Sequence, residues 1–180
     1  MRFFATLAAI GLLSVPAVAH AHTVMNSPTP RDASDAHKSG PCGGVARVGK
    51  PTQYTPGQKV TVEFTETVDH RGCFQVAFSA ANDANFTVLA QIDDPTGDAV
   101  PKKRTVDVTL PTTPCPACTL VVRQLMINQP CKTTQQPNET GAGDTYFSCA
   151  DICIGATCTS APDPDAGSTS SSSSSGSTSS

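Results

Sequence analysis

Two histidines, His22 and His70, are the residues of this 180-residue chain best suited to metal chemistry. If a peptidase cut the chain after Ala21, the free α-amine and the ring Nδ1 of His22 could hold one ion together. The amine has an unperturbed pKa of about 8 and gives up its proton to a metal readily. An isolated His70, where a turn leads into an alternating apolar stretch, would most simply finish that turn. Beside His22 it would complete three nitrogens, a set suited to copper.

The first 21 residues have the features of a secretory signal peptide. A basic start (Arg2) precedes an apolar run over residues 3–13, which is shorter than the roughly 20 residues of a membrane span, and small residues follow. Two cleavage frames fit these small residues. Cleavage after Ala19 would release a chain that begins at His20, whose His-Ala-His start can wrap copper(II) in a square plane. Cleavage two residues later gives the His22 chelate, which the sequence favours.

Composition agrees with export. The chain has eight cysteines, an even number that predicts a disulfide framework in a secreted protein. Cys115 and Cys118 are spaced as in redox or zinc motifs, but without a second such pair a structural bridge is the better prediction. Removal of the leader leaves eleven basic and fifteen acidic side chains, a balance that argues against nucleic acid. No second apolar stretch follows the leader, so we expect a soluble protein without a membrane span.

The elements that must position the histidines are β-strands, because the dominant hydrophobic period is two. We expect antiparallel strands with one face in a core, and no segment shows a sustained helical period. Alternating stretches lie at 60–64, 74–78 and 106–110, further strand-like runs at 86–92, 118–126 and 145–154, and turn clusters at 51–57, 93–97 and 111–116. The predicted fold is an all-β, disulfide-stabilised sandwich of the immunoglobulin or fibronectin-III kind, although no Trp is present.

The predicted domain organisation has three parts. Residues 1–21 form the signal peptide, residues 22–159 form one β-sandwich domain, and residues 160–180 form a flexible tail. The tail is rich in Ser, Gly and Thr and cannot bury enough apolar surface to fold. Within the domain His37 lies in a polar stretch, where we expect it to be solvated.

Three stretches resemble the copper-brace lytic polysaccharide monooxygenases. Residues 22–31 (HTVMNSPTPR) are similar to the mature start of bacterial chitin- and cellulose-active members. Residues 70–79 (HRGCFQVAFS) are similar to the fungal stretch in which the second brace histidine precedes Gly and a strand. Residues 146–152 (YFSCADI) resemble the strand that carries a buried axial tyrosine. Together the three stretches, in the family's order, span nearly the whole domain.

The resemblance implies a role for each matching residue. His22 would supply the amine and Nδ1, His70 the third nitrogen, and Tyr146 the axial position over one copper ion. Phe147 takes that position instead if the strand register slips by one residue. Asp144 stands where fungal members often keep a glutamine, which is a departure from the family. The resemblance also implies a disulfide between Cys42 and Cys149.

The implied function is that of a secreted, copper-dependent enzyme that cleaves glycosidic bonds oxidatively, with chitin or cellulose as substrate and an external electron donor. Two alternatives stay open. A copper-handling protein could use the same brace without oxidising a polysaccharide, but such proteins commonly add Met- or His-rich tracts, and the mature chain offers only Met25 and Met126. A metal-free secreted binding module remains if His22 stays internal. The few aromatic residues, with only Tyr54 and Tyr146 as tyrosines, favour the alternatives.

Overall fold

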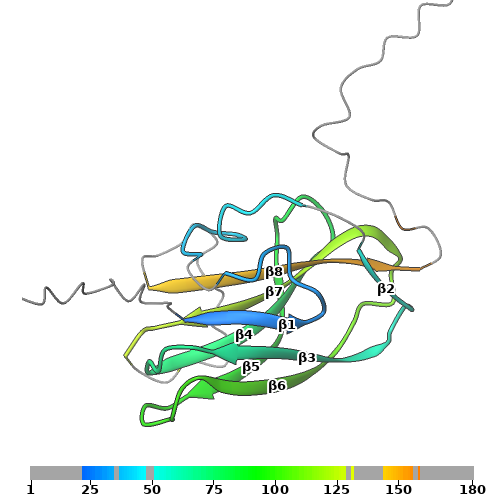
Figure 1. The fold of residues 1–180 in the computed structure, drawn as a ribbon. Helices are drawn as coiled ribbons and strands as arrows, with labels where there is room; N and C mark the ends of the chain where they lie inside the picture. Colours follow the sequence, from blue (N-terminus) through cyan, green and yellow to red (C-terminus); the bar gives the residue numbers. More distant parts are fainter. Residues whose placement is uncertain are drawn as a thin grey trace, which may run out of the picture.

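The computed structural model describes residues 22–34, 37–47, 51–128, 131, 144–155 and 158. In these residues eight strands form two sheets packed face to face (Figure 1). The smaller sheet has the order β1 (Thr23–Ser27), β3 (Lys59–Glu66), β6 (Lys102–Thr109). The larger sheet has the order β2 (Thr52–Tyr54), β8 (Thr145–Ile154), β7 (Cys115–Leu125), β4 (Gly72–Ser79), β5 (Thr87–Asp94). The all-β sandwich is confirmed, and the described part contains no helix that could cross a membrane.

Most strands follow the alternating pattern, but two were not expected. β2 lies inside the predicted turn cluster 51–57, and it pairs in parallel with the end of β8. The larger sheet is therefore mixed, and the expectation of purely antiparallel strands is wrong for this edge. β1 was also missed. These strands have three and five residues, too few for a period of two to stand out, and pairing with a neighbouring strand holds them.

The main core lies between the two sheets. Alternate residues of β3 and β6 point inward and meet the larger sheet, where the rings of Phe64 and Phe74 contact each other with centroids 4.9 Å apart. All eight residues of β4 and all ten of β8 are buried, so the expectation of a single buried face is wrong for these two strands. The reason is a second cluster on the outer face of the larger sheet, formed by Cys42, Ala77, Phe86, Val121, Phe147 and Cys149.

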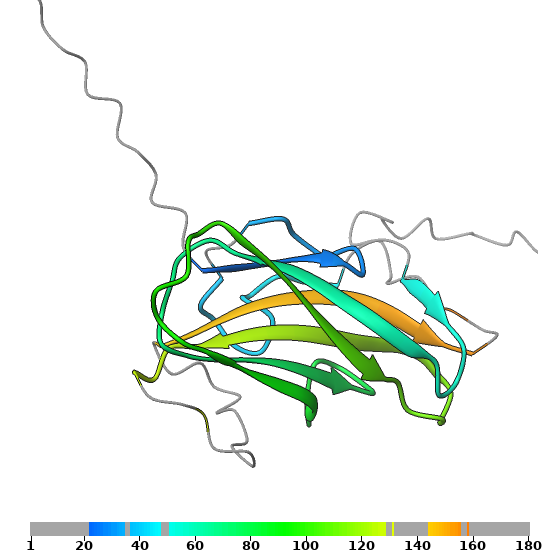
Figure 2. The same cartoon turned by 90° about the horizontal axis from the view of Figure 1, so that it is seen from below.

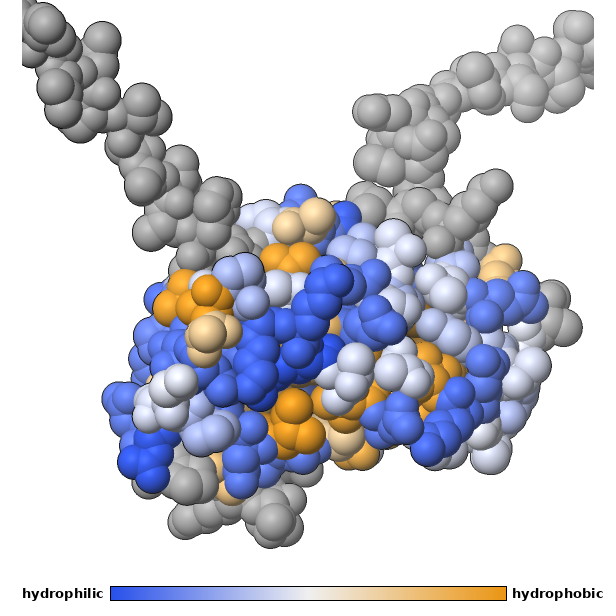
Figure 3. Space-filling model, turned by 60° about the horizontal axis from the view of Figure 1, so that its bottom comes forward, coloured by the Kyte–Doolittle hydropathy of each residue, from blue (hydrophilic) through white to orange (hydrophobic). Residues whose placement is uncertain are grey.

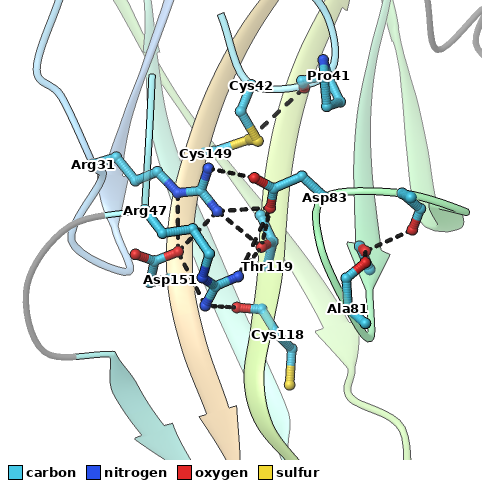
Figure 4. A network of polar contacts seen from close by, with 12 residues as sticks. Arg31, Pro41, Cys42, Arg47, Ala81, Asp83, Cys118, Thr119, Cys149 and Asp151 are labelled. Atoms are coloured by element: carbon cyan, nitrogen blue, oxygen red, sulfur yellow. Dashed lines mark hydrogen bonds and ion pairs between the residues drawn. A yellow bond between two sulfur atoms is a disulfide. The ribbon is translucent and has the colours of Figure 1, made fainter. Parts of the chain in front are cut away.

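The segment after β1, which runs over the outer face of the larger sheet, is held there by buried ion pairs (Figure 4). Arg31 donates two hydrogen bonds of 2.7 Å to Asp83 and one of 2.9 Å to Asp151 on β8. Arg47 lies 3.2 Å from the same Asp151 and donates to Thr119 on β7 at 2.8 Å. The Arg31 side chain is only 1% exposed. The network thus fixes the course of residues 28–34 and 37–47, which contain no helix or strand (Figure 2).

Four disulfides close the described part of the chain, joining Cys42 to Cys149, Cys73 to Cys131, Cys115 to Cys118, and Cys153 to Cys158. The predicted pairing of Cys42 with Cys149 is confirmed, and it lies in the outer cluster. The Cys115–Cys118 pair forms a bridge, as expected for an exported chain.

Candidate metal centre

The three predicted site residues come together at one end of the sandwich. His22 immediately precedes β1, His70 lies two residues before β4, and Tyr146 is the second residue of β8. The start of β1 pairs with the end of β3, and the starts of β4 and β8 both pair with the end of β7. A hydrogen bond of 3.0 Å from the Met25 amide to the Ser148 hydroxyl joins β1 to β8 across the two sheets. Residues 48 and 124 positions after His22 in the sequence therefore meet it in space.

Ring contacts connect these three side chains. Nε2 of His22 lies 2.9 Å from Nε2 of His70, and the two ring planes differ by 4°. The His22 ring also stacks on Tyr146, with centroids 3.5 Å apart and planes 10° apart. His22 is 8% exposed and Tyr146 5%. His70 is half-buried. The histidine pair therefore has a covered side, formed by Tyr146, and a more open side at His70.

A single residue, Thr67, holds both backbone groups of His22. The His22 amide donates to the Thr67 hydroxyl at 2.8 Å, and the Thr67 amide donates to the His22 carbonyl at 3.0 Å. His22 has a φ of 114°, in the region that side chains other than glycine seldom adopt. Such a conformation costs about 1–3 kcal/mol and persists where surrounding contacts impose it. The position of His22 is thus imposed by its surroundings rather than by local preference.

The turn that carries His70 connects β3 to β4 over residues 67–71. Besides the contacts with His22, three hydrogen bonds hold it in the described part of the chain: Gln124 Nε2 to Val68 O at 3.3 Å, the Gly97 amide to Asp69 Oδ2 at 2.9 Å, and the Asn128 amide to Arg71 O at 3.0 Å. Gly72 follows the turn, and a Cβ there would lie 1.7 Å from the carbonyl oxygen of Leu125. The glycine after His70 is therefore required by the close approach of β7.

Tyr146 and Phe147 point to opposite faces of the larger sheet, as neighbours on a strand must. Tyr146 lies against His22, whereas Phe147 packs in the outer cluster around the Cys42–Cys149 bridge. Asp144 is exposed, and its carbonyl oxygen accepts a hydrogen bond from the Met126 amide. The register of β8 therefore brings Tyr146, and not Phe147, to the histidine pair.

Other predicted positions differ from expectation. His37 is not simply solvated, because its Nε2 lies 3.0 Å from Asp32 Oδ1. Met25, one of the two methionines considered as extra ligands, is 1% exposed in the main core. The alternative start at His20 lies outside the described residues.

Three residues near the pair were not found from the sequence: Thr67, Gln124 and Lys38. Lys38 is exposed, with its Nζ 4.7 Å from the centre of the Tyr146 ring. The Phe147 amide donates to the carbonyl of His37 at 2.9 Å, which places the next residue over the start of β8. No local pattern marks these residues, because each acquires its place through a contact distant in sequence.

The donor types fit copper. Two neutral imidazoles can share one proton between facing nitrogens, and a metal ion can take the place of that proton. An α-amine ligates through its lone pair and keeps N–H groups, so a bond from the His22 nitrogen to Thr67 is compatible with ligation. The observed contact joins the two Nε2 atoms and does not involve Nδ1 of His22. The structure thus assembles nitrogen donors without displaying the predicted chelate.

A buried ionic cluster lies beside the turn. Glu66, Asp94 and Asp98 carry carboxylate oxygens within 4.8 Å of one another. Arg104 contacts all three at 2.6–2.8 Å, so a guanidinium already pairs with each carboxylate. Burial, and then repulsion from Glu66, raises the pKa of Asp94 to about 7 against the attraction of Arg104. The cluster is therefore an ion-pair network and not a second metal site.

Comparison with known proteins gives a likeness to solved structures but none to sequence families. No protein-family model matches the chain, and no curated protein sequence matches it. Among solved structures, the chain is similar to a lytic polysaccharide monooxygenase of class AA15 from Thermobia domestica in the Cu(I) state. The sequences are 21% identical, the TM-score is 0.41, and the match covers 57% of this chain. It covers 62% of the other chain, so the chain spans less than two thirds of that protein's length.

Proposed function

We propose that this protein is a secreted copper-dependent polysaccharide monooxygenase in which His22 and His70 would hold the copper ion and Tyr146 would cover its inner side. The observation that carries the proposal is the 2.9 Å contact between the two histidine Nε2 atoms, with Tyr146 stacked on His22. Three segments far apart in sequence bring these side chains to one end of a rigid sandwich. A chance cluster of core aromatics would not require two facing imidazole nitrogens.

The proposed site depends on maturation. In the full chain the His22 nitrogen is a peptide amide, which is a poor metal ligand until it loses its proton. Cleavage after Ala21 would convert it into an amine that ligates through its lone pair. The Thr67 hydroxyl, which accepts the His22 N–H at 2.8 Å, would then orient that amine. Thr67 is thus assigned to hold the terminus in place during maturation and ligation.

Bound copper would supply a one-electron redox centre that activates oxygen or peroxide for hydrogen abstraction from a glycosidic carbon. The chain's own residues would fix and cover that centre. Tyr146 excludes water from the inner side of the histidine pair, since it is 5% exposed and its ring lies 3.5 Å from that of His22. His70 is the more open of the two histidines, and a substrate chain would approach from its side.

The decisive experiment is copper EPR on protein secreted with its own leader and without an N-terminal tag. We expect a three-nitrogen copper signal that is lost in His22→Ala and in His70→Ala. His37→Ala is the matched control, because His37 pairs with Asp32 and should leave the signal intact. If all three variants bound copper as the parent does, the site assignment would be wrong. A four-nitrogen, square-planar signal indifferent to His70 would instead place the start of the chain at His20.

One observation favours a copper-handling protein as the second candidate. No aromatic side chain in the described part of the molecule is exposed, and Tyr54 packs against the main core. On the face that Figure 3 shows, hydrophilic residues surround small, separate apolar patches. Flat aromatic surfaces are the usual partners of sugar rings. Incubation with chitin or cellulose, copper and a reductant separates the candidates, since only the enzyme releases oxidised oligosaccharides.

A further inference from the structure

A buried glutamine links the turn that carries His70 to the interior of the sandwich. Gln124 lies on β7 and is 0% exposed. Its side chain points to the same face of the strand as Val122, which belongs to the main core. Its Nε2 donates to the carbonyl of Val68 and to Oδ2 of Asp94, both at 3.3 Å. The side-chain amide of Gln124 therefore holds the 67–71 turn at Val68 from the core side.

The same glutamine lies next to the tyrosine of the site. Gln124 on β7 is directly opposite Tyr146 on β8 in the antiparallel register. Opposite residues on one face of such a pair have Cβ atoms about 4.5–5.5 Å apart. One side chain thus stands beside the ring that supports His22 and contacts the turn that carries His70. No other strand residue described above has this relation to both histidines.

The hydrogen bonds continue from Gln124 into a closed circuit. Asp94 Oδ1 accepts from Arg104 Nη2 at 2.8 Å, and Arg104 Nε donates to Glu66 Oε2 at 2.8 Å. Glu66 ends β3 and immediately precedes Thr67, which binds both backbone groups of His22. The circuit therefore leaves the turn at Val68 and returns to the residue just before it. It therefore holds the chain on both sides of Thr67, the residue that binds His22.

This circuit occupies space that apolar side chains could fill. Glu66, Asp94 and Gln124 are each at most 1% exposed. Oε1 of Glu66 and Oε1 of Gln124 are buried and have no hydrogen-bond partner among the described residues. Each unsatisfied buried group costs about 1–3 kcal/mol. Buried ionic groups often add little net stability. The presence of these polar groups in the interior is therefore better explained by the geometry that they impose on the turn.

We propose that Gln124, held by Asp94, is a positioning residue that sets the 67–71 turn so that Nε2 of His70 faces His22. This inference rests on the proposed function and assigns a supporting residue to its metal site. Gln124 acts through Val68 and does not touch the ion. Loss of the Gln124 amide leaves the donor atoms in the chain but lets the turn relax. The position of the His70 ring relative to His22 then becomes less well defined.

The test compares two buried glutamines of the same sheet. Gln124→Met removes the amide at nearly constant volume. Gln75→Met is the matched control, because Gln75 is also 0% exposed, points to the opposite face of β4 and donates to Gln91 at 2.8 Å. Copper affinity and the EPR spectrum are measured on processed protein, histidine ring signals by NMR on metal-free protein, and stability by thermal unfolding.

The expected result for Gln124→Met is a loss of copper affinity of about 10- to 100-fold, the range found when supporting residues of metal ligands are removed. The EPR parameters and the metal-free ring signals of His70 should change as well. Gln75→Met should lower the unfolding temperature without changing either. If Gln124→Met kept the parent spectrum, affinity and His70 signals, the positioning role would be wrong while the copper proposal stood.

Two further outcomes keep the inferences separable. If the parent protein bound no copper, the proposed function would fail, and unchanged His70 signals in metal-free Gln124→Met would then overturn the positioning role independently. If Gln124→Met did not fold, Asp94→Asn tests the same link, since it withdraws the carboxylate that holds the Gln124 amide. A parent-like copper spectrum together with parent-like His70 signals in Asp94→Asn would contradict the inference.

Discussion

At the scale of single residues, the buried carboxyl of Asp94 has a raised pKa. Burial and the neighbouring Glu66 raise its pKa from 3.8 to about 7, although Arg104 attracts its charge and Gln124 donates to it; the more distant Asp69 raises it further. The folded state therefore holds this proton more tightly than the unfolded chain does. The resulting stability is fully present below about pH 4 and is lost as the pH rises through about 7.

We therefore predict that the unfolding temperature of the metal-free parent falls between pH 5 and pH 8 and that Asp94→Asn flattens this fall. Calorimetry across that range measures both slopes. Asp107→Asn is the control, because the Asp107 pKa is lowered by Thr61 and Lys59 and its titration lies below this window. Equal slopes in the parent and in Asp94→Asn would contradict the assignment of the proton to Asp94.

A second residue-scale prediction concerns Gly72. A methyl group at this position would overlap the Leu125 carbonyl, which belongs to the backbone and cannot rotate away. Gly72→Ala should therefore force β4 and β7 apart at the end that carries His70. We expect a loss of about 1–3 kcal/mol, as for other overpacked sites, measured by urea unfolding. A variant as stable as the parent would show that the two strands have room to separate there.

At the scale of elements, the segment between β1 and β2 depends on Arg31. This side chain is 1% exposed and bridges Asp83 to Asp151. Burial alone would raise the pKa of Asp83. The hydrogen bonds from Arg31 and Thr119 nevertheless hold that pKa below its usual value. This contribution is present above the unfolded pKa and is lost as the pH falls through the folded one. The segment should therefore be least well held in acid.

We predict that Arg31→Met lowers the free energy of unfolding by about 3 kcal/mol, because it removes the guanidinium that bridges the buried Asp151 and the half-buried Asp83, although Arg47 stays 3.2 Å from Asp151. Lys59→Met is the comparison: Lys59 pairs with Asp107 at 3.0 Å, but both side chains are more than half exposed and such pairs contribute little. Urea unfolding of both variants at neutral pH measures the difference. Similar losses in the two variants would mean that the buried network contributes no more than a surface pair.

The contrast between elements shows what the sequence could predict. The alternation of Val60, Val62 and Phe64 marks β3 because one face of that strand meets water and the other the core. The bounds of β8 could be predicted from the sequence. Its burial on both faces could not, because the outer face is covered in part by Cys42, about a hundred positions earlier in the chain. β2 carries no signal of its own and exists through its parallel pairing with β8.

The same division holds for the candidate site. His22 and His70 could be singled out because their side chains carry chemistry that few other residues of the chain offer, whereas Tyr146 was reached only through the resemblance of its strand to that of the copper-brace family. Gln124 and Thr67 could not, since buried glutamines and threonines at strand ends are common and only the register across β7 and β8 and the turn after β3 gives them their neighbours. Candidate ligands can be recognised from the local sequence, whereas the residues that support them can be recognised only from the whole fold.

At the scale of the molecule, disulfides of different span should contribute differently. The Cys42–Cys149 bridge closes 107 residues and the Cys153–Cys158 bridge closes 5. Chain-entropy arguments give about 4–5 kcal/mol for the long span and about 2 kcal/mol for the short one. We predict this order when each pair is replaced by serines and unfolding is followed in urea. The reverse order would mean that local packing around Cys153 outweighs the entropy of the long loop.

The direction of β8 has a practical consequence for handling the protein. Tyr146 is the second residue of this strand and Ile154 the last, so the two residues stand about 27 Å apart at 3.4 Å per residue (Figure 1). A linker fused after Cys158, which keeps the bridge to Cys153, would therefore leave from the end opposite the histidine pair. Immobilised through such a linker on an electrode, the molecule would turn its histidines toward the solution. Voltammetry in that orientation would report exchange with dissolved partners rather than direct contact with the metal surface.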